Sequence, residues 1–202
     1  MSLFSRLGRK YLDLLKVHPV KTKAMTSFTL MAAADVAVQS RSEEPLDPIR
    51  TLRFASFGFV FGPAGHAWYG FLERVFKPSA SLAGLVKSVS VDQLIFAPII
   101  LGTFFTYLCA LEGKGAEATR QKISQDLPPT IVSPKISSQV NNWFLWVPTQ
   151  IINFKYVPEF LRLPVVSSVA LLWNIYLAVM TNKPVKPREA DNRFKHDNLE
   201  TT

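Results

Sequence analysis

The chain has 202 residues, of which 48% are hydrophobic, with a formal net charge of +8 and a mean hydropathy of +0.15. These values fit a soluble domain as well as a membrane protein, so the distribution of the charges has to decide. A nucleic-acid-binding domain gathers its Lys and Arg on one folded face. Here they lie in the N-terminal segment, the short connections and the tail, which suits anionic lipid headgroups and gives no reason to expect direct nucleic-acid binding.

Residues 1–23 predict a basic amphipathic helix. Its apolar residues recur three and four apart while its charged residues take other faces: Leu3, Leu7, Tyr11 and Leu14 against Arg6, Lys10 and Asp13. Such a helix lies on a membrane surface. The segment lacks the continuous apolar run of a secretory signal. A cleaved mitochondrial presequence is the alternative, because the first residues include bases and no acid.

Five long stretches follow that carry one acid or no charge at all: 24–40, 54–72, 88–111, 136–154 and 163–182. A helix needs roughly 17–25 mostly apolar residues to cross the hydrocarbon core, whereas a soluble surface helix carries a charge every turn or so. We therefore expect an all-α, multi-pass membrane helix bundle over residues 24–182, followed by a polar, disordered tail over 183–202.

The number of crossings is the harder question. If all five stretches cross the membrane, the Lys and Arg residues between them are divided almost equally between its two sides. If 136–154 does not fully cross, one side carries clearly more of them. We therefore prefer four spans with 136–154 as a fifth hydrophobic segment.

The second stretch contains Gly58 and Gly62, a small-xxx-small pattern that lets two helix backbones approach closely. Pro63 follows and is expected to kink the helix. Close packing is the interpretation we favour, and a flexible gating joint is the alternative. Cys109, the single cysteine, excludes an intrachain disulfide. We expect it to be a packing residue, with a redox role through an intermolecular bridge as the alternative.

Ionisable groups at membrane depth are costly and face a partner or a water-filled path. Asp35 and Gln39 are four apart and share one helix face. Asp92 and Gln93 lie near the start of the third stretch, and His66 lies within the second. The plain interpretation is a hydrogen bond between helices for Asp35 and a helix cap at the membrane interface for Asp92. The functional one is a polar passage.

The fourth stretch is the most polar. Its polar residues are spaced 3, 4, 4 and 3 along one helical stripe: Gln139, Asn142, Trp146, Gln150 and Asn153. Such a stripe requires other helices or water beside it, not lipid. The candidates for a polar interior or pore are therefore Asp35, Gln39, His66, Asp92, Gln93, Gln150 and Asn153.

The run that begins at this stripe is similar to the signature of the Mpv-seventeen and 22-kilodalton peroxisomal membrane protein family. Its signature residues here are Trp146, Pro148, Gln150, Asn153, Phe154, Val157, Pro158 and Arg162. The resemblance extends over roughly residues 11 to 182. The family usually places proline directly after the tryptophan, whereas Val147 intervenes here, which affects the expected helix geometry more than membership.

The resemblance implies a four-span membrane protein of mitochondria or peroxisomes with no established enzymatic reaction. Members similar at full length include the fungal stress-inducible type of the mitochondrial inner membrane, which is tied to ethanol metabolism under heat stress and to maintenance of mitochondrial DNA. Members have also been proposed to act as non-selective channels.

We expect no catalysis, cofactor or metal, because the chain has no Cys/His zinc ligand set, no Gly-rich phosphate loop and no Gly-x-Ser-x-Gly elbow. The leading hypothesis is a channel or metabolite-permeation protein of the mitochondrial inner membrane, in which Asp35 favours cations. Its expected partners are membrane lipid, a second copy of the chain, and small solutes or cations. The alternatives are a non-conducting membrane scaffold or assembly partner, and a peroxisomal membrane protein of the same family.

Overall fold

The computed structural model describes residues 3–41, 45–117, 119–121 and 136–181, and the regular structure in these ranges is helical throughout. The helices are α1 Leu3–Val17, α2 Pro19–Gln39, α3 Pro48–Ser56, α4 Gly58–Phe76, α5 Leu82–Val91, the π-helix η1 Asp92–Phe96, α6 Ala97–Leu111, α9 Ile136–Tyr156 and α10 Glu159–Thr181. The all-α prediction is confirmed. The predicted polar tail lies outside the described residues.

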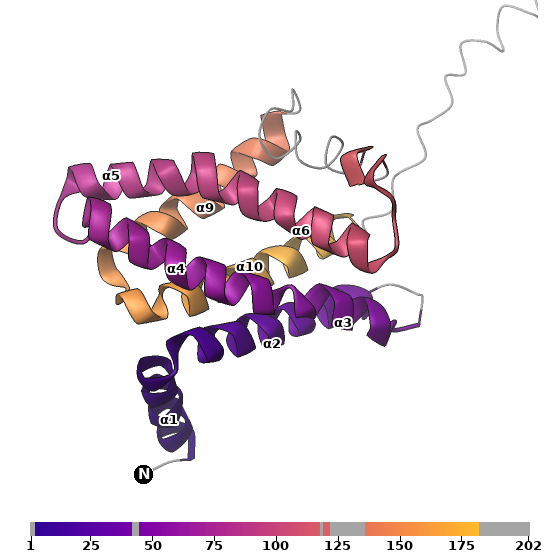
Figure 1. The fold of residues 1–202 in the computed structure, drawn as a ribbon, viewed down its shortest axis with the longest axis horizontal. Coiled ribbons are helices and arrows are strands. Elements are labelled where there is room, and N and C mark those ends of the chain that lie inside the picture. The colour runs from indigo at the N-terminus through magenta and orange to yellow at the C-terminus, as the bar shows by residue number, and fades with distance from the viewer. Residues whose placement is uncertain (1–2, 42–44, 118, 122–135, 182–202) are drawn as a thin grey trace, which may run out of the picture.

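The long helices run side by side, and α1 turns away from them at one end (Figure 1). Helix α2 contacts α4, α10, α3 and α1, while α9 contacts α5 and α10. The buried apolar core lies among α4, α5, α9 and α10 and consists of Tyr69, Leu72, Leu85, Val89, Phe154, Leu163 and Val166. The turn between α1 and α2 falls at His18, because Pro19 begins the second helix.

Two glycines let α2 and α4 approach closely. A Cβ atom at Gly58 would overlap the backbone of Phe28, and one at Gly62 would overlap the backbone of Ala24. The close packing that the small-xxx-small pattern predicted is therefore confirmed. Pro63 lies within α4 directly after this contact, and α4 continues through it to Phe76.

The second predicted stretch, 54–72, is divided between two helices at Phe57. Helix α3 begins earlier, where Asp47 Oδ1 accepts the backbone N–H groups of Ile49 and Arg50 at 2.9 and 3.0 Å. Phe57 is 3% exposed and packs against the rings of Phe104 and Tyr107 on α6. The buried ring thus attaches the junction of α3 and α4 to α6, a contact that a map of charges alone does not show.

Helices α5, η1 and α6 form one continuous rod, Leu82–Leu111. Among the described residues it is the one helix long and apolar enough to cross a membrane. The π-helical turn falls before Pro98, which has no N–H to donate, and the N–H of Ala97 donates to Asp92 O, five residues back. The number of crossings stays a prediction.

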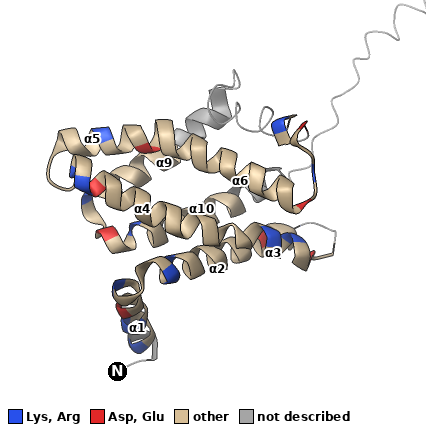
Figure 2. Cartoon of the chain, in the orientation of Figure 1, with Lys and Arg blue, Asp and Glu red and all other residues tan. Residues whose placement is uncertain are grey.

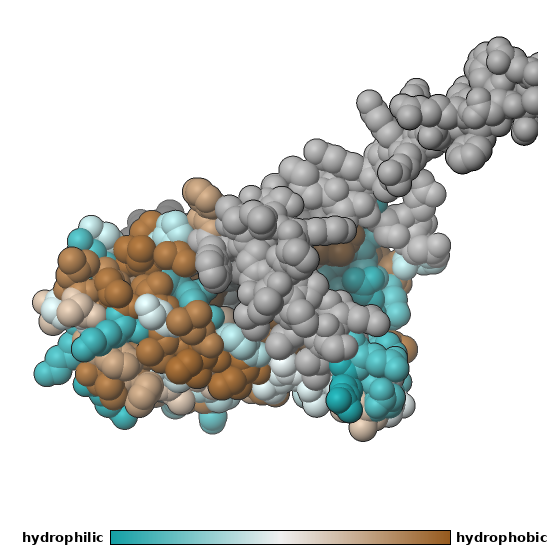
Figure 3. Space-filling model, turned by 90° about the horizontal axis from the view of Figure 1, so that it is seen from above, coloured by the Kyte–Doolittle hydropathy of each residue, from teal (hydrophilic) through white to brown (hydrophobic). Residues whose placement is uncertain are grey.

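The surface of this rod is apolar. Leu82, Leu94 and Ile99 are 76%, 68% and 60% exposed, and a brown patch lies on the part of this face that no grey atoms cover in Figure 3. Most charged residues lie near the ends of the long helices, and Asp92 is the exception within the rod Leu82–Leu111 (Figure 2). At one such end the Glu112 carboxylate accepts from Lys114 Nζ at 2.5 Å and raises the pKa of that ammonium group. An apolar middle between charged ends is the pattern of membrane helices.

The α2–α4 contact gives a stability prediction. Replacing Gly62 with Ala should lower the free energy of unfolding in detergent by about 1–3 kcal/mol, because the new methyl group forces two backbones apart. Gly8, on exposed α1, is the matched control, because a Cβ atom there would meet nothing within 4 Å. Gly8→Ala should be neutral or stabilising by about 0.5–1 kcal/mol. Equal effects of the two substitutions in thermal unfolding would contradict this packing.

Candidate functional site

Asp92 lies at the start of η1 and is only 2% exposed. Its Oδ1 accepts a hydrogen bond from Trp68 Nε1 at 2.9 Å, and its Oδ2 accepts from Gln150 Nε2 at 2.6 Å and from Gln93 Nε2 at 3.0 Å. All three donors are neutral, and no cation among the described residues forms an ion pair with this carboxylate. The acid that we expected as a cap at the interface is instead enclosed by α4, η1 and α9.

Gln150 extends this cluster along α9. Its Nε2 also donates to the Tyr69 hydroxyl at 3.3 Å, and its Oε1 accepts from Asn153 Nδ2 at 3.2 Å. Asn153 Oδ1 and Ser88 Oγ are buried and have no hydrogen-bond partner within the described residues. The predicted stripe thus turns its Gln150 and Asn153 side chains into the bundle. The side chains of Gln139 and Asn142 lie outside the described residues.

Asp35 and Gln39 form a second cluster, between α2 and α3. Asp35 Oδ2 accepts from Gln39 Nε2 at 2.5 Å and from the Thr51 hydroxyl at 2.7 Å, and its Oδ1 pairs with Arg50 at 3.2 Å. Gln39 Oε1 accepts the backbone N–H of Asp47 at 2.6 Å. This acid therefore has a cationic partner, and its bonds tie the end of α2 to the start of α3.

His66 takes part in a third contact, with Lys23. Lys23 is 1% exposed, and its Nζ lies 3.0 Å from Nδ1 of His66, joining α2 to α4. Lys23 was the last residue of our predicted N-terminal segment. The structure places it inside α2, because the boundary between α1 and α2 lies at His18. The predicted pore candidates are thus distributed over three separate contacts, and the hydrogen bonds described do not join them into one polar interior.

Arg162 joins three elements near the turn between α9 and α10. Its Nη1 donates to Glu73 Oε2 on α4 at 2.8 Å, its Nη2 to Phe154 O and its Nε to Val157 O, both at 3.3 Å. Its guanidinium group also lies over the Phe154 ring, 5.4 Å from the centroid. The arginine is 2% exposed, so these three bonds and the ring contact stand in for water around a buried charge. The sequence indicated Arg162 only through the signature, and it gave no sign of Glu73, Trp68 or Lys23 as partners.

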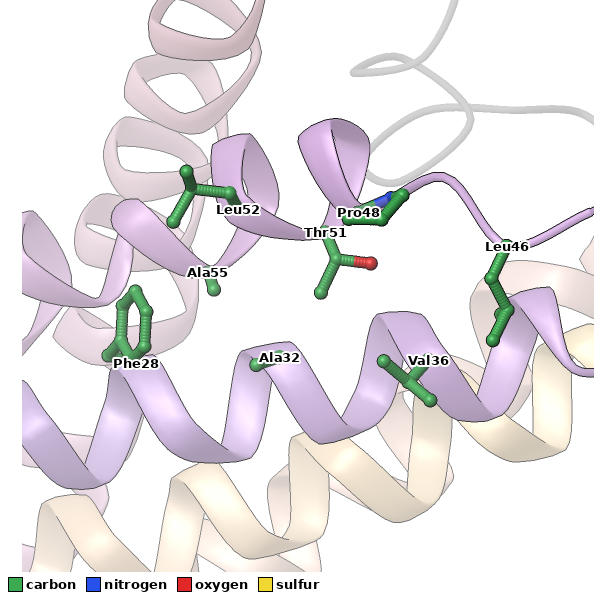
Figure 4. Close-up of a pocket in the computed structure, with 8 residues that line it drawn as sticks. All are labelled: Phe28, Ala32, Val36, Leu46, Pro48, Thr51, Leu52 and Ala55. Atoms are coloured by element: carbon green, nitrogen blue, oxygen red, sulfur yellow. The ribbon is translucent and has the colours of Figure 1, made fainter.

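One pocket of about 300 Å³ lies between α2 and α3 (Figure 4). Its lining consists of Phe28, Ala32, Val36, Leu46, Pro48, Thr51, Leu52 and Ala55. Only Thr51 is polar, and its hydroxyl is bound to Asp35 and Gln39. This pocket is therefore apolar and is not the polar passage that the sequence predicted. Within the described ranges, no three His, Cys, Asp or Glu side chains come together as metal ligands would.

Comparison with known proteins shows to which family the chain belongs. The chain is 36% identical over 178 residues to Peroxisomal membrane protein 2 of Bos taurus, covering 84% of this chain and 86% of that one. It is 33% identical over 182 residues to Mitochondrial inner membrane protein Mpv17 of Xenopus laevis, covering 88% and 98%. The chain belongs to the Mpv17/PMP22 family.

The Mpv17/PMP22 family model itself matches residues 109–178. A further relative, Protein SYM1 of Eremothecium gossypii, is 35% identical over 171 residues, which cover 81% of this chain and 90% of that one. No solved structure matches. The resemblance seen in the sequence is thus confirmed, and the chain is a membrane protein of this family.

The Mpv17/PMP22 signature divides into buried and exposed parts. Gln150, Asn153, Phe154 and Arg162 are at most 3% exposed and make the contacts described above. The prolines are on the outside: Pro148 within α9 and Pro158 in the turn before α10. The polar signature residues are therefore bonded between helices, and the prolines shape the helices that carry them.

The Arg162 contact predicts a large stability effect. Arg162→Met should lower the free energy of unfolding by about 3 kcal/mol, because Glu73 and two carbonyl groups lose a buried donor. Exposed Arg74, on the same end of α4, is the control, and Arg74→Met should change stability by less than about 0.5 kcal/mol. Thermal or denaturant unfolding in detergent measures both, and a stable Arg162→Met variant would refute the role of this contact.

Proposed function

We propose that this chain is a permeation protein of the mitochondrial inner membrane whose described arrangement is the closed one, with Asp92 as the group that attracts cations. The observation that supports it is the burial of Asp92 within the long apolar helix, held only by neutral donors. An ionisable residue at membrane depth is by default a functional group, because it is too costly to keep for packing alone.

Asp35 is the useful comparison. We expected it to set the cation preference, yet its charge is balanced by Arg50 at 3.2 Å. A carboxylate paired in this way attracts a passing cation weakly, since the arginine cancels its field. Asp92 has three hydrogen-bond donors but no balancing charge in the part of the chain that the structure describes, so its field is the stronger one. The cation preference in the proposal therefore moves from Asp35 to Asp92.

The closed arrangement follows from the bonds around Asp92. Gln150 and Gln93 both donate to Oδ2, and the Trp68 indole donates to Oδ1. Opening a path would require α9 to move away from η1 and water to replace these donors. Pro148 lies two residues before Gln150 and cannot donate to the carbonyl of Phe144, so α9 lacks a hydrogen bond where such a bend is needed.

The relatives support the organelle. The relatives in Xenopus laevis, Danio rerio and Homo sapiens are named Mitochondrial inner membrane protein Mpv17. A relative in Bos taurus is named Peroxisomal membrane protein 2, which indicates a different organelle. We propose the mitochondrial inner membrane, with the peroxisomal membrane as the second candidate. Stress response, ethanol metabolism under heat stress and maintenance of mitochondrial DNA are the roles we propose by resemblance to the fungal type. We propose no catalytic reaction.

Conduction tests the proposal directly. Purified full-length protein in planar bilayers under a potassium chloride gradient should conduct with a reversal potential on the cation-selective side. Asp92→Asn should move that potential toward zero, because it removes the unbalanced charge. Asp35→Asn is the matched control and should leave selectivity nearly unchanged. Silent bilayers with well-folded protein, or a shift with Asp35→Asn alone, would count against the assignment.

A non-conducting scaffold is the second candidate. It is supported by the direct bond between Asp92 and Gln150, because interhelical hydrogen bonds of this kind help to hold membrane helices together. The scaffold account predicts that Gln150→Leu destabilises the bundle and leaves any flux untouched. The permeation account predicts that the same variant also changes conductance per channel, because Gln150 contacts the group that sets selectivity.

The cellular role can be tested by complementation. Expression of this chain in a fungal strain that lacks its own Protein SYM1 should restore growth on ethanol at raised temperature. Asp92→Asn should restore it poorly and Asp35→Asn nearly fully, provided that both variants reach wild-type abundance. A tagged copy should co-purify with mitochondrial inner membranes. Co-purification with peroxisomes would move the proposed address to the alternative.

A further inference from the structure

Helix α1 leaves the bundle but remains attached to it. It ends at Val17, and the chain turns at His18 before Pro19 begins α2, so α1 runs across the direction of α2 (Figure 1). Leu15 is fully buried, and the Tyr11 hydroxyl lies 3.0 Å from Thr26 Oγ1 on α2. Lys16 Nζ lies 5.9 Å from the Phe160 ring centroid on α10. The helix is therefore held at a defined angle and is not a loose extension.

Only part of the apolar face of α1 is covered by the bundle. Leu15 and Tyr11 face α2, whereas Leu7, Leu14 and Val17 are 58%, 43% and 68% exposed. The bases Arg6, Arg9, Lys10 and Lys16 are exposed as well, and Lys10 lies beside Leu7 and Leu14, which are three and four residues away. A helix with uncovered leucines next to a basic face suits a surface that is apolar below and anionic above.

The position of α1 fits the edge of a membrane. It packs at the end of the bundle where α2 and α10 begin, since it contacts both. The α9–α10 turn lies at the same end, and there Arg162 holds Glu73 of α4, beside Arg74. Charged residues mark the level at which the long helices leave the hydrocarbon core. A helix that crosses their direction at this level lies along the membrane surface.

We propose that α1 binds an anionic phospholipid surface, with Leu7 and Leu14 in the acyl boundary and Arg6 and Lys10 at the headgroups. The positive charge of the helix selects an anionic lipid, because residues 6–16 contain four bases and one acid, Asp13. Each base near an anionic surface changes the balance of bound and free helix by about five-fold. Neutral lipid alone would offer Arg6 and Lys10 no anionic group. The inference does not depend on conduction.

The test uses the full chain in lipid nanodiscs, in a Cys109→Ala background. A nitroxide label is placed at Leu7→Cys or, as the matched control, at Asp13→Cys on another face of α1. Discs of phosphatidylcholine alone are compared with discs that also contain phosphatidylglycerol. Accessibility to oxygen and to a water-soluble nickel chelate reports the depth of each label. In the anionic discs the Leu7 label should be shielded from nickel and the Asp13 label accessible.

Reversing the charge of two bases on α1 tests whether the anionic headgroups hold the helix. Arg6→Glu with Lys10→Glu should return the Leu7 label to water in the anionic discs, as should high salt. Lys87→Glu with Lys114→Glu, at exposed lysines outside α1, should not move it. Three results would overturn the proposal: a Leu7 label open to nickel in anionic discs, shielding that survives charge reversal and rises with protein concentration (a second copy), or mature mitochondrial protein that begins after Val17.

Discussion

The hydrogen bond from Gln150 Nε2 to Asp92 Oδ2, 2.6 Å long, joins the long apolar helix to the rest of the bundle. Within the described residues the outer side chains of that helix, such as Leu94 and Ile99, are exposed, so its inner face supplies the attachment. A carboxyl group in an apolar surrounding has to be hydrogen-bonded, because a buried polar group without a partner costs roughly 2–7 kcal/mol. The side chains of Trp68, Gln93 and Gln150 therefore point their N–H groups at the Asp92 carboxyl group.

The other buried ionisable side chains also need polar partners, but the partners differ in charge. Asp35 receives a cation, Arg50, and Arg162 receives an anion, Glu73, so each of these charges is balanced. Lys23 finds only a neutral ring nitrogen on His66 among the described residues. The balanced pairs lie near helix ends. Asp92 lies within the continuous rod, and that difference in position is why a functional role is assigned to it and not to Asp35.

Features that depend on one helix alone were predictable from the sequence. The four-residue spacing of Asp35 and Gln39 predicted a shared face, and their side chains are bonded. The spacing of Gly58 and Gly62 predicted a close helix contact, and the backbones of α2 and α4 meet there. Local periodicity determines which residues share a face, so such predictions hold when the helix forms.

Features that depend on which helices face one another were not predictable. Trp68 and Asp92 are 24 residues apart and Arg162 and Glu73 are 89 apart, and no spacing rule pairs them. The polar residues were therefore assigned to one common interior, whereas the structure distributes them over separate contacts. The boundary at residue 23 misplaced Lys23 for a related reason, since a charge map treats every lysine as exposed.

A double-mutant cycle on Asp92 and Gln150 measures the central interaction most directly. The free energies of unfolding of Asp92→Ala, Gln150→Leu and the double variant are compared with that of the unchanged protein in one detergent. A direct charged hydrogen bond between the two side chains predicts a coupling energy above about 1 kcal/mol. Additive effects, with coupling within about 0.3 kcal/mol of zero, would contradict the account of how this bundle is held together.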